Sequence, residues 1–279
     1  MTLRYSKILY LFLDISDLRA SRLLFEDGLG FPIIEERFHP PHHRHGVVKY
    51  DGGDTIVALN LADSSFEKNI SSGITTVIST SAMREADIYL RFQELGLEVP
   101  TASGNIFADV DNHRYVVTRD DLHRPNEEST SVRELRLSVD ALEPIISFCT
   151  NILDLQPITR SETEAIFATG NVRLAYQLDP AAQQQRRRGC LIVFYASNIE
   201  SSYATLVGRG MKFTTEVGYS QIGGTARFID PGDNVFCLYE PSEECLSWES
   251  GAKVRDIIAD ARGVGSRQID RETSTKYII

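Results

Sequence analysis

Cysteine is scarce in this sequence, and no CxxC pair occurs. The four cysteines among 279 residues are Cys149, Cys190, Cys237 and Cys245, and their spacing is irregular. Neither a disulfide framework nor a zinc knuckle is therefore indicated. Because the chain shows no sign of needing disulfides, we expect it to work in a reducing, cytoplasmic compartment.

Long hydrophobic runs and basic surfaces are also lacking. No apolar run reaches about 18 residues, so we expect no membrane-spanning helix. The apolar stretch near the N-terminus is short and contains Asp14, which is more typical of a first strand than of a signal peptide. The chain has 29 Lys and Arg against 39 Asp and Glu, a net charge of -10. This balance disfavours nucleic acid or an anionic membrane as the main partner, since both bind basic surfaces.

An internal repeat is the strongest feature that the sequence does have. Residues 8–31 alternate apolar with other side chains and then show a Ser-Asp helix start. An apolar helix stripe through Leu18, Leu23 and Leu24 follows, and a glycine ends it. Residues 132–155 follow the same plan at an offset of 124 positions, without a gap. Such self-similarity indicates that one supersecondary unit is used repeatedly.

Two weaker copies of the same plan occupy the rest of the chain. Residues 72–100 predict a strand and a helix that ends at Gly96, and residues 189–213 predict a helix that ends near Gly208 or Gly210. The polar residues 126–130 join the two halves. The domain boundaries that we expect are 1–125, 131–245 and a C-terminal extension over 246–279.

In a unit of this kind, the helix covers one face of an antiparallel sheet and the other face curves around a cavity. Side chains that alternate away from the helix are therefore candidates for a pocket. They are Tyr10, Phe12, Glu134, Arg136, Tyr195, Cys237 and Tyr239. The aromatic members would suit a flat organic ligand by stacking, although aromatic residues at alternating positions also build plain core.

Two stretches resemble the vicinal oxygen chelate superfamily of glyoxalases, bleomycin-resistance proteins and extradiol dioxygenases. They are LYLFLDISDLRASRLLFEDGLGFPIIEER and FIDPGDNVFCLYEP, and the likeness covers residues 5–242. The resemblance implies an α+β fold in which four βαβββ modules pair into two domains, each an open cup of strands. It also implies, for catalytic members, a divalent metal in the cup.

The resemblance assigns most of the metal-ligand positions of these modules to residues that do not bind metals, although Cys and Glu together could hold zinc. The positions hold Tyr10, Val116, Glu134 and Cys237, with Thr75 and Leu191 on the middle strands, and none is histidine. Two potential ligands are too few for a stable site, and oxygen chemistry on iron or manganese prefers imidazole and carboxylate. We therefore expect no metal cofactor, and we interpret Cys237 as a small buried filler.

Several ionisable residues leave alternatives open. His39, His42, His43 and His45 lie in one Pro-containing loop, which is either a metal-binding loop or a solvated, pH-responsive one. Glu134 is a general base if it is desolvated, or a structural residue if Arg136 or Arg173 pairs with it.

Arginine side chains and the C-terminal extension are the last candidates for a role. Arg136, Arg173 and Arg227 would orient an anionic or carbonyl-bearing ligand, unless they are merely solvent-exposed. Residues 251–262 predict an amphipathic helix through Val254, Ile257 and Ile258, packed on the body or on a second subunit of a homodimer. The tail from Gly263 onward shows no pattern that we can interpret.

Three functions are compatible with these observations. The first is a metal-independent protein that binds an aromatic or apolar small organic molecule, either to sequester it or to catalyse a proton transfer or rearrangement with Glu134 as the base. The second is a metal-dependent dioxygenase or lyase with non-standard ligands drawn from Glu134, Cys237 and the His39 to His45 loop. The third is a non-catalytic structural or interaction protein whose cup is filled by its own side chains. The absence of histidine from the metal-ligand positions favours the first of these functions.

Overall fold

The computed structural model describes residues 7–38, 46–61, 73–96, 106–119, 130–179 and 189–259. Its chain divides into two compact units. Unit 1 comprises residues 1–9, 137–180 and 192–279, and unit 2 comprises residues 10–136 and 181–191. The division falls within strands β1 (Ile8–Ile15), β8 (Ser131–Val139) and β12 (Cys190–Tyr195). The domain boundaries expected at residues 125 and 245 remain predictions.

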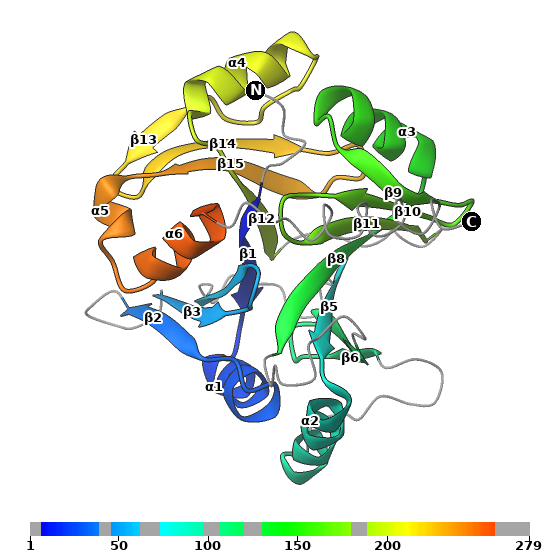
Figure 1. Cartoon of the computed structure of the whole chain (residues 1–279), viewed down its shortest axis with the longest axis vertical. Coiled ribbons are helices and arrows are strands. Elements are labelled where there is room, and N and C mark those ends of the chain that lie inside the picture. Colours follow the sequence, from blue (N-terminus) through cyan, green and yellow to red (C-terminus); the bar gives the residue numbers. More distant parts are fainter. Residues whose placement is uncertain are drawn as a thin grey trace, which may run out of the picture. The chain divides into compact units, whose positions relative to one another are not determined.

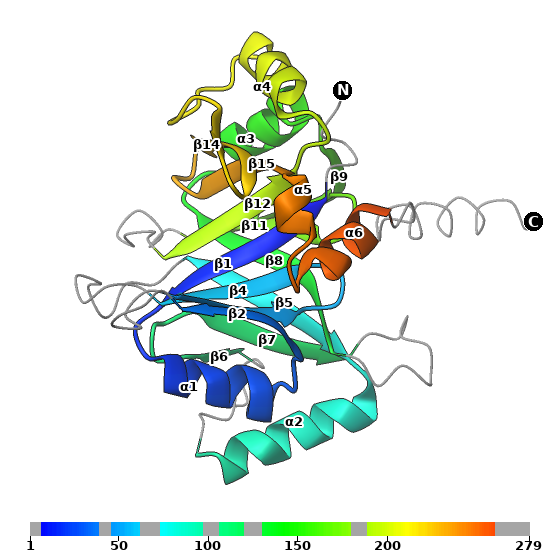
Figure 2. The same cartoon turned by 90° about the vertical axis from the view of Figure 1, so that its left-hand side faces the viewer.

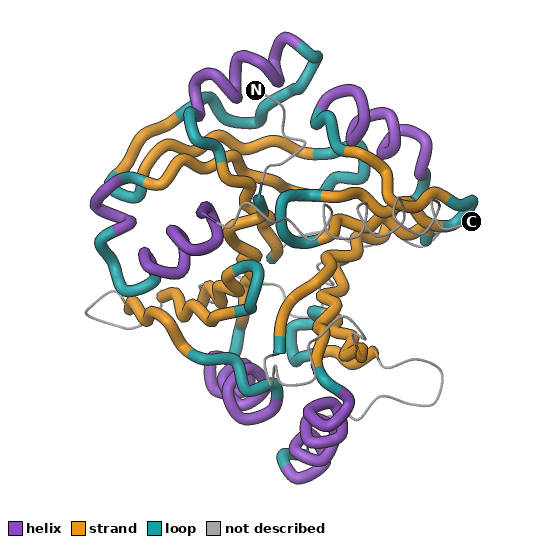
Figure 3. The backbone as a smooth tube through the Cα atoms, viewed as in Figure 1, coloured by secondary structure: helices purple, strands orange, loops and turns teal. Residues whose placement is uncertain are grey.

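Four modules, each with a strand, a helix and further strands, follow one another along the chain (Figures 1 and 3). The first contains β1, α1 (Leu18–Arg22), the π-helical turn η2 (Leu23–Gly28), β2 (Ile33–Phe38), β3 (Gly46–Asp51) and β4 (Ile56–Leu61). The described part of the second contains β5 (Ile74–Thr80), α2 (Ala82–Glu94), β6 (Ile106–Ala108) and β7 (Arg114–Arg119).

The third and fourth modules repeat this order, and two short helices follow them. The third contains β8, α3 (Leu142–Ser147), η3 (Phe148–Ile152), β9 (Gln156–Arg160), β10 (Glu164–Ala168) and β11 (Arg173–Leu178). The fourth contains β12, α4 (Ile199–Gly208), β13 (Gly218–Ser220), β14 (Gly223–Ile229) and β15 (Val235–Pro241). Helices α5 (Glu243–Leu246) and α6 (Gly251–Ala259) complete the described chain. The α+β class built from βαβββ modules is thereby confirmed.

Side-chain caps and left-handed residues determine where the helices begin and end. Asp17, Ser81 and Asn198 each accept a hydrogen bond from an amide of the first helical turn, which satisfies a donor that the helix leaves unpaired. After α2 and α4 the chain leaves the helix through Gly96 and Gly210, at φ 66° and 92°. Both ends agree with the sequence prediction.

The first and third modules close their helices in the same way. The amide of Leu29 donates to Leu24 O at 2.8 Å, and the amide of Leu153 donates to Phe148 O at 3.1 Å. Each of these bonds spans five residues, which is the spacing of a π-helical turn. The next residue, Gly30 or Asp154, is left-handed in both modules, at φ 70° and 58°. The repeat seen in the sequence is therefore retained in backbone detail.

The predicted apolar stripe of the first helix is partly wrong. Leu24 is buried, but Leu18 and Leu23 are only half-buried. The residues that α1 and η2 bury are Ser21, Leu24, Phe25 and Gly28. The buried positions have the i, i+3, i+4 and i+7 spacing of one helix face, whereas Leu18 and Leu23 are five residues apart and lie beside that face.

Unit 2 contains two runs of strands packed around an aromatic core. Within this unit the strand orders are β1-β4-β3-β2 and β6-β7-β5. Helices α1 and α2 lie on the same side of these strands (Figures 1 and 2). Phe25 of η2 stacks on Tyr50 with ring centroids 5.3 Å apart and meets the edge of Tyr115 at 5.8 Å. Tyr50 and Tyr115 are fully buried, so these rings are the centre of the unit.

Unit 1 has a corresponding core. Its strand orders are β13-β14-β15-β12 and β11-β10-β9. Phe228 stacks on Phe236 at 5.3 Å and contacts Phe148 of η3 at 6.3 Å. Helix α4 lies on one side of β14 and β15, and α5 and α6 lie on the other (Figures 1 and 2). The aromatic layer faces α4, so the opposite face is left for the C-terminal helices.

All four cysteines are free thiols, as their spacing predicts. Within the described ranges, no helix combines the length and the apolar character needed to cross a membrane. Helix α6 buries Val254 and Ile257, and Ile258 is half-buried, so the amphipathic stripe expected there is present.

Candidate functional site

A tight turn holds the start of β15 in unit 1. The buried carboxylate of Asp230 accepts hydrogen bonds from the amides of Gly232 and Asn234, both at 2.8 Å, and from Asn234 Nδ2. Burial raises the pKa of Asp230 above its ordinary value, and these hydrogen bonds oppose the rise. The turn of the second module has the same contacts around Asp109. The turn therefore has a local structural role, which is to start the last strand of a module.

Four of the predicted site residues share one face of adjacent strands in unit 1. Arg227 of β14 lies opposite Cys237 of β15, and Tyr239 lies opposite Tyr195 of β12. Their neighbours Phe228 and Phe236 point into the aromatic layer on the α4 side. Because successive strand residues point to opposite faces, Arg227, Cys237, Tyr195 and Tyr239 lie on the face away from α4. We call this set the β15 face.

Cys237 is a buried, protonated thiol on that face. It is 4% exposed, and its Sγ donates to Leu238 O at 3.0 Å. Burial raises the pKa of this thiol to about 11, although a hydrogen bond from Ala226 and the charge of Arg227 act in the opposite direction. Because a thiolate is a better metal ligand and nucleophile than a thiol, the raised pKa disfavours both roles for Cys237 at neutral pH.

One end of the β15 face is covered by the C-terminal helices. The hydroxyl of Tyr239 donates to Ile222 O at 2.7 Å and lies 3.1 Å from Cys245 Sγ of α5. Farther along, Lys7 Nζ donates to Ile257 O of α6 at 2.5 Å. Tyr239 is therefore buried, whereas Tyr195 is half-buried and Arg227 is exposed. A ligand on this face would meet Tyr195 and Arg227 first.

A second group of predicted residues lies in unit 2. Tyr10 and Phe12 of β1 have ring centroids 5.4 Å apart, and Lys49 Nζ lies 5.6 Å from the Tyr10 ring. The register places Lys49 beside Ala58, which lies opposite Phe12, so these side chains share a face. Tyr50 and Leu11 point to the other face, toward η2. Tyr10 and Phe12 thus lie on the face away from α1, as their alternation predicts.

An ionic pair that the sequence reasoning missed lies beside Tyr10. Glu35 is 1% exposed and accepts a hydrogen bond from Lys49 Nζ at 3.0 Å. Arg37 Nε also lies 2.8 Å from Glu35. A lysine between Val48 and Tyr50 in an otherwise apolar strand is a signal that could have indicated a buried charge.

Glu134 and Arg136 of β8 form an ion pair in unit 2. Arg136 Nε lies 2.5 Å from Glu134 Oε1, and Glu134 is 1% exposed. This ion pair is the contact that the structural alternative for Glu134 requires, in which Arg136 pairs with the carboxylate. Arg173, the other arginine considered for that role, begins β11 in unit 1 and is half-buried.

The two described residues that were considered as alternative metal ligands each have another contact. Cys237 Sγ donates to Leu238 O, and Glu134 is bound to Arg136. In the part of the chain that the structure describes, no group of three or more His, Cys, Asp or Glu residues is arranged to hold a metal ion. His39, His42, His43 and His45 lie outside the described residues, as does the tail from Gly263.

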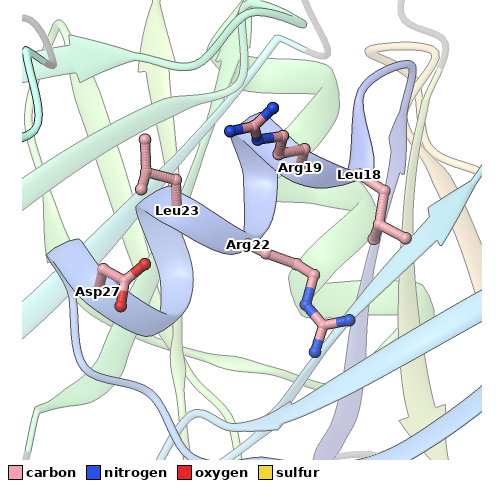
Figure 4. A pocket seen from close by; sticks show the side chains of 5 residues that line it. All are labelled: Leu18, Arg19, Arg22, Leu23 and Asp27. Carbon is pink, nitrogen blue, oxygen red and sulfur yellow. The ribbon is translucent and has the colours of Figure 1, made fainter.

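A shallow surface hollow, not predicted from the sequence, lies along α1 and η2. It has a volume of about 450 Å³ and is lined by Leu18, Arg19, Arg22, Leu23 and Asp27 (Figure 4). Arg22 is bound to Glu26 at 2.8 Å and to Glu36 at 2.6 Å. The hollow is wide open, and its polar side chains point in different directions (Figure 4). We therefore interpret it as an ordinary helix surface and not as a binding site.

The similarity of this chain to known proteins lies in its structure and not in its sequence. No protein-family model matches the sequence, and no curated protein matches it. The chain is similar to the structure of a putative dioxygenase from Bacillus subtilis, with a TM-score of 0.68 at 10% identity over 99% of this chain and 97% of the other. It is also similar to the structure of glyoxalase I from Zea mays, with a TM-score of 0.64 at 14% identity over 84% of this chain and 92% of the other.

Proposed function

We propose that this protein, which has the vicinal oxygen chelate fold, binds an aromatic or apolar small organic molecule. In this proposal the binding needs no metal ion at Glu134 and Cys237. The observation that carries the proposal is the β15 face, where aromatic, cationic and thiol side chains from three neighbouring strands lie on the same side. The proposal includes sequestration of the ligand and metal-independent catalysis as its two modes.

Each side chain of the β15 face would make a different contact with the ligand. Tyr195 offers a half-buried ring for stacking on a flat ligand. Arg227, which is exposed, offers donors to a carbonyl or anionic substituent. Cys237, uncharged and buried, would supply an apolar floor.

Sequestration is the mode that the Glu134 contact favours. A general base must be free to accept a proton, but Glu134 is paired with Arg136. If the protein is an enzyme nevertheless, Glu134 is its base. In that case Glu134→Gln would lower turnover by on the order of a hundredfold or more, whereas a sequestering protein would keep its ligand affinity.

Elemental analysis of protein purified without an affinity tag tests the proposal that the protein holds no metal ion. We expect less than a tenth of an equivalent, roughly, of zinc, iron or manganese, because the two potential ligands are too few to retain an ion. A stoichiometric metal would reject the proposal in favour of a dioxygenase or lyase with non-standard ligands.

Fluorescence titration with 8-anilinonaphthalene-1-sulfonate tests the binding part, since this probe is flat, aromatic and anionic. We expect Tyr195→Leu and Arg227→Gln each to weaken binding roughly fivefold to tenfold, the cost of one lost stacking or charged contact. Tyr219→Leu is the matched control, because Tyr219 is an exposed tyrosine of the same unit that bonds to Glu200. Equal effects of Tyr195→Leu and Tyr219→Leu would count against the β15 face.

A second candidate function is supported by the covering of Tyr239. If α5 and α6 fill the β15 face permanently, the protein is a non-catalytic structural or interaction protein whose cup is occupied by its own chain. The same titration separates the two functions, because that protein would show no saturable binding of the probe in the unmodified chain.

A further inference from the structure

Two arginines of α2 converge on one glycine in unit 2. A Cβ atom built on Gly30 would touch Arg84 Nη2 and would lie 3.5 Å from Arg91 Nη1. Arg84 and Arg91 are seven residues apart, so their Cα atoms are separated by roughly 10 Å along the helix axis. Their long side chains must therefore bend toward each other to reach the same point.

The two guanidinium groups have no carboxylate partner among the described residues. Arg84 Nε is buried without any hydrogen-bond partner. Among the described residues of this unit, the other cations that are at least half-buried are each paired with a carboxylate: Arg22 with Glu26, Lys49 with Glu35, Arg133 with Asp54, and Arg136 with Glu134. Two neighbouring positive charges without a counter-ion are unfavourable, and an anion between them would relieve the repulsion.

The internal repeat shows what occupies the equivalent place in unit 1. The residue that corresponds to Gly30 is Asp154, which has the same left-handed backbone, at φ 58° against 70°. Its carboxylate faces an arginine of the neighbouring helix: Asp154 Oδ2 lies 3.8 Å from Arg209 Nη2, just after α4. In unit 1 the chain thus supplies its own anion, and in unit 2 a glycine stands where that carboxylate would be.

From these observations we infer that Gly30, Arg84 and Arg91 form a binding site for a small oxyanion, with phosphate-type groups as the ligand class. Two guanidinium groups suit such a ligand because each presents several donors in a planar fork. The anion takes the place that the Asp154 carboxylate takes in unit 1. The site is separate from the β15 face, and the inference does not depend on the proposed function.

The charges around the site are consistent with one bound anion. Asp87 lies on α2 between the two arginines, one turn from each, but it is exposed and no ion pair to either arginine is found within the described residues. The carbonyl end of η2 precedes Gly30 directly in the chain and carries only a partial negative charge. Neither Asp87 nor the end of η2 therefore supplies the full negative charge that two guanidinium groups can bind.

Inorganic phosphate is the probe for this site, used with the full-length protein at constant ionic strength. We expect phosphate to raise the thermal unfolding midpoint saturably beyond the effect of matched chloride, as a ligand of the folded state must. Phosphorus NMR line broadening gives the dissociation constant independently. Arg84→Gln and Arg91→Gln should each raise that constant roughly tenfold, whereas Arg19→Gln, which removes an exposed arginine of α1, should leave it unchanged.

Substitution of Gly30 provides the sharpest comparison. Gly30→Asp would place a carboxylate where unit 1 has one, and we expect it to abolish the phosphate response. Gly30→Asn has the same shape and tolerates the left-handed backbone equally well, so it should retain most of the response. Asp87→Asn should tighten phosphate binding roughly twofold to fivefold by removing a competing charge.

Three results would overturn the inference. They are a phosphate effect no larger than that of chloride, an equal response of Gly30→Asp and Gly30→Asn, and unchanged binding in both arginine variants. If the two Gly30 variants do not fold, the arginine variants alone test the oxyanion site, since they leave the backbone at residue 30 unaltered. Loss of stability in those variants without any loss of phosphate binding would mean that the arginines only hold the end of η2.

Discussion

Arg136 Nε lies 2.5 Å from the carboxylate of Glu134, which is almost completely buried. Removing the arginine would leave a buried charge with fewer partners, so Arg136→Met should lower the free energy of unfolding by about 1–3 kcal/mol. Denaturant unfolding measures this loss. Arg160→Met is the control, because the Arg160 and Glu143 side chains are 55% and 76% exposed and their pair should contribute less than about 0.5 kcal/mol. Equal losses would show that the Glu134 pair is no stronger than a surface one.

Helix α6 should be held by the small apolar stripe that it buries. Ile257→Ala should destabilise the docking of the helix by about 2–4 kcal/mol, since it removes a nearly buried aliphatic side chain. Hydrogen exchange of the α5 and α6 amides measures this local opening. Asp256→Ala, on the exposed side of the same helix, should have little effect. Unchanged exchange in Ile257→Ala would contradict the idea that these side chains keep the helix in place.

The Cys237 thiol should make stability depend on alkaline pH. Burial raises its pKa in the folded state from 9.0 to about 11. The protonated form is therefore favoured by folding, and this contribution is fully present below pH 9 and is lost as the pH rises through about 11. Unfolding of the unmodified chain and of Cys237→Ala between pH 8 and 11, roughly, should show the difference between them shrinking as pH rises. Rapid alkylation of Cys237 at pH 8 would contradict the raised pKa.

Two glycines should respond in opposite ways to the same substitution. A Cβ atom at Gly28 would lie 2.7 Å from Phe92 Cε1, so Gly28→Ala should force η2 and α2 apart and cost about 1–3 kcal/mol. At Gly208, the last residue of α4, nothing lies within 4 Å of the added atom. Gly208→Ala should therefore be neutral or stabilising by up to about 1 kcal/mol. Thermal unfolding distinguishes the two, and equal shifts would show that the η2–α2 contact has room to relax.

Features that depend on neighbouring residues along the chain could be predicted from the sequence. Alternation of Tyr10 and Phe12 with Leu11 and Leu13 predicted β1 and the face on which each side chain lies. The offset of 124 residues predicted that the first and third modules would share their local structure, and Leu29 and Leu153 confirm this in their hydrogen bonds. Both inferences rest on local periodicity, which the amino-acid order contains directly.

Features that depend on strand register or on the packing of helices could not be predicted in the same way. Glu35 and Lys49 meet because β2 and β3 pair in one particular register, with a bulge after Ile33. Arg84 and Arg91 were not singled out, because only the packing of α2 against η2 brings them to Gly30.

Strands β1, β8 and β12 each begin in one compact unit and end in the other. As a consequence, no single cut in the gene yields an intact half. A recombinant fragment spanning residues 10–136 would lack Gly189, whose carbonyl accepts the Asp14 amide at 2.8 Å. Exchange of half-genes at the central joint would leave every strand whole, but β1 and the hydrogen-bonded segment at β12 would then come from different parents. Such hybrids should be insoluble unless the two parents supply matching strands.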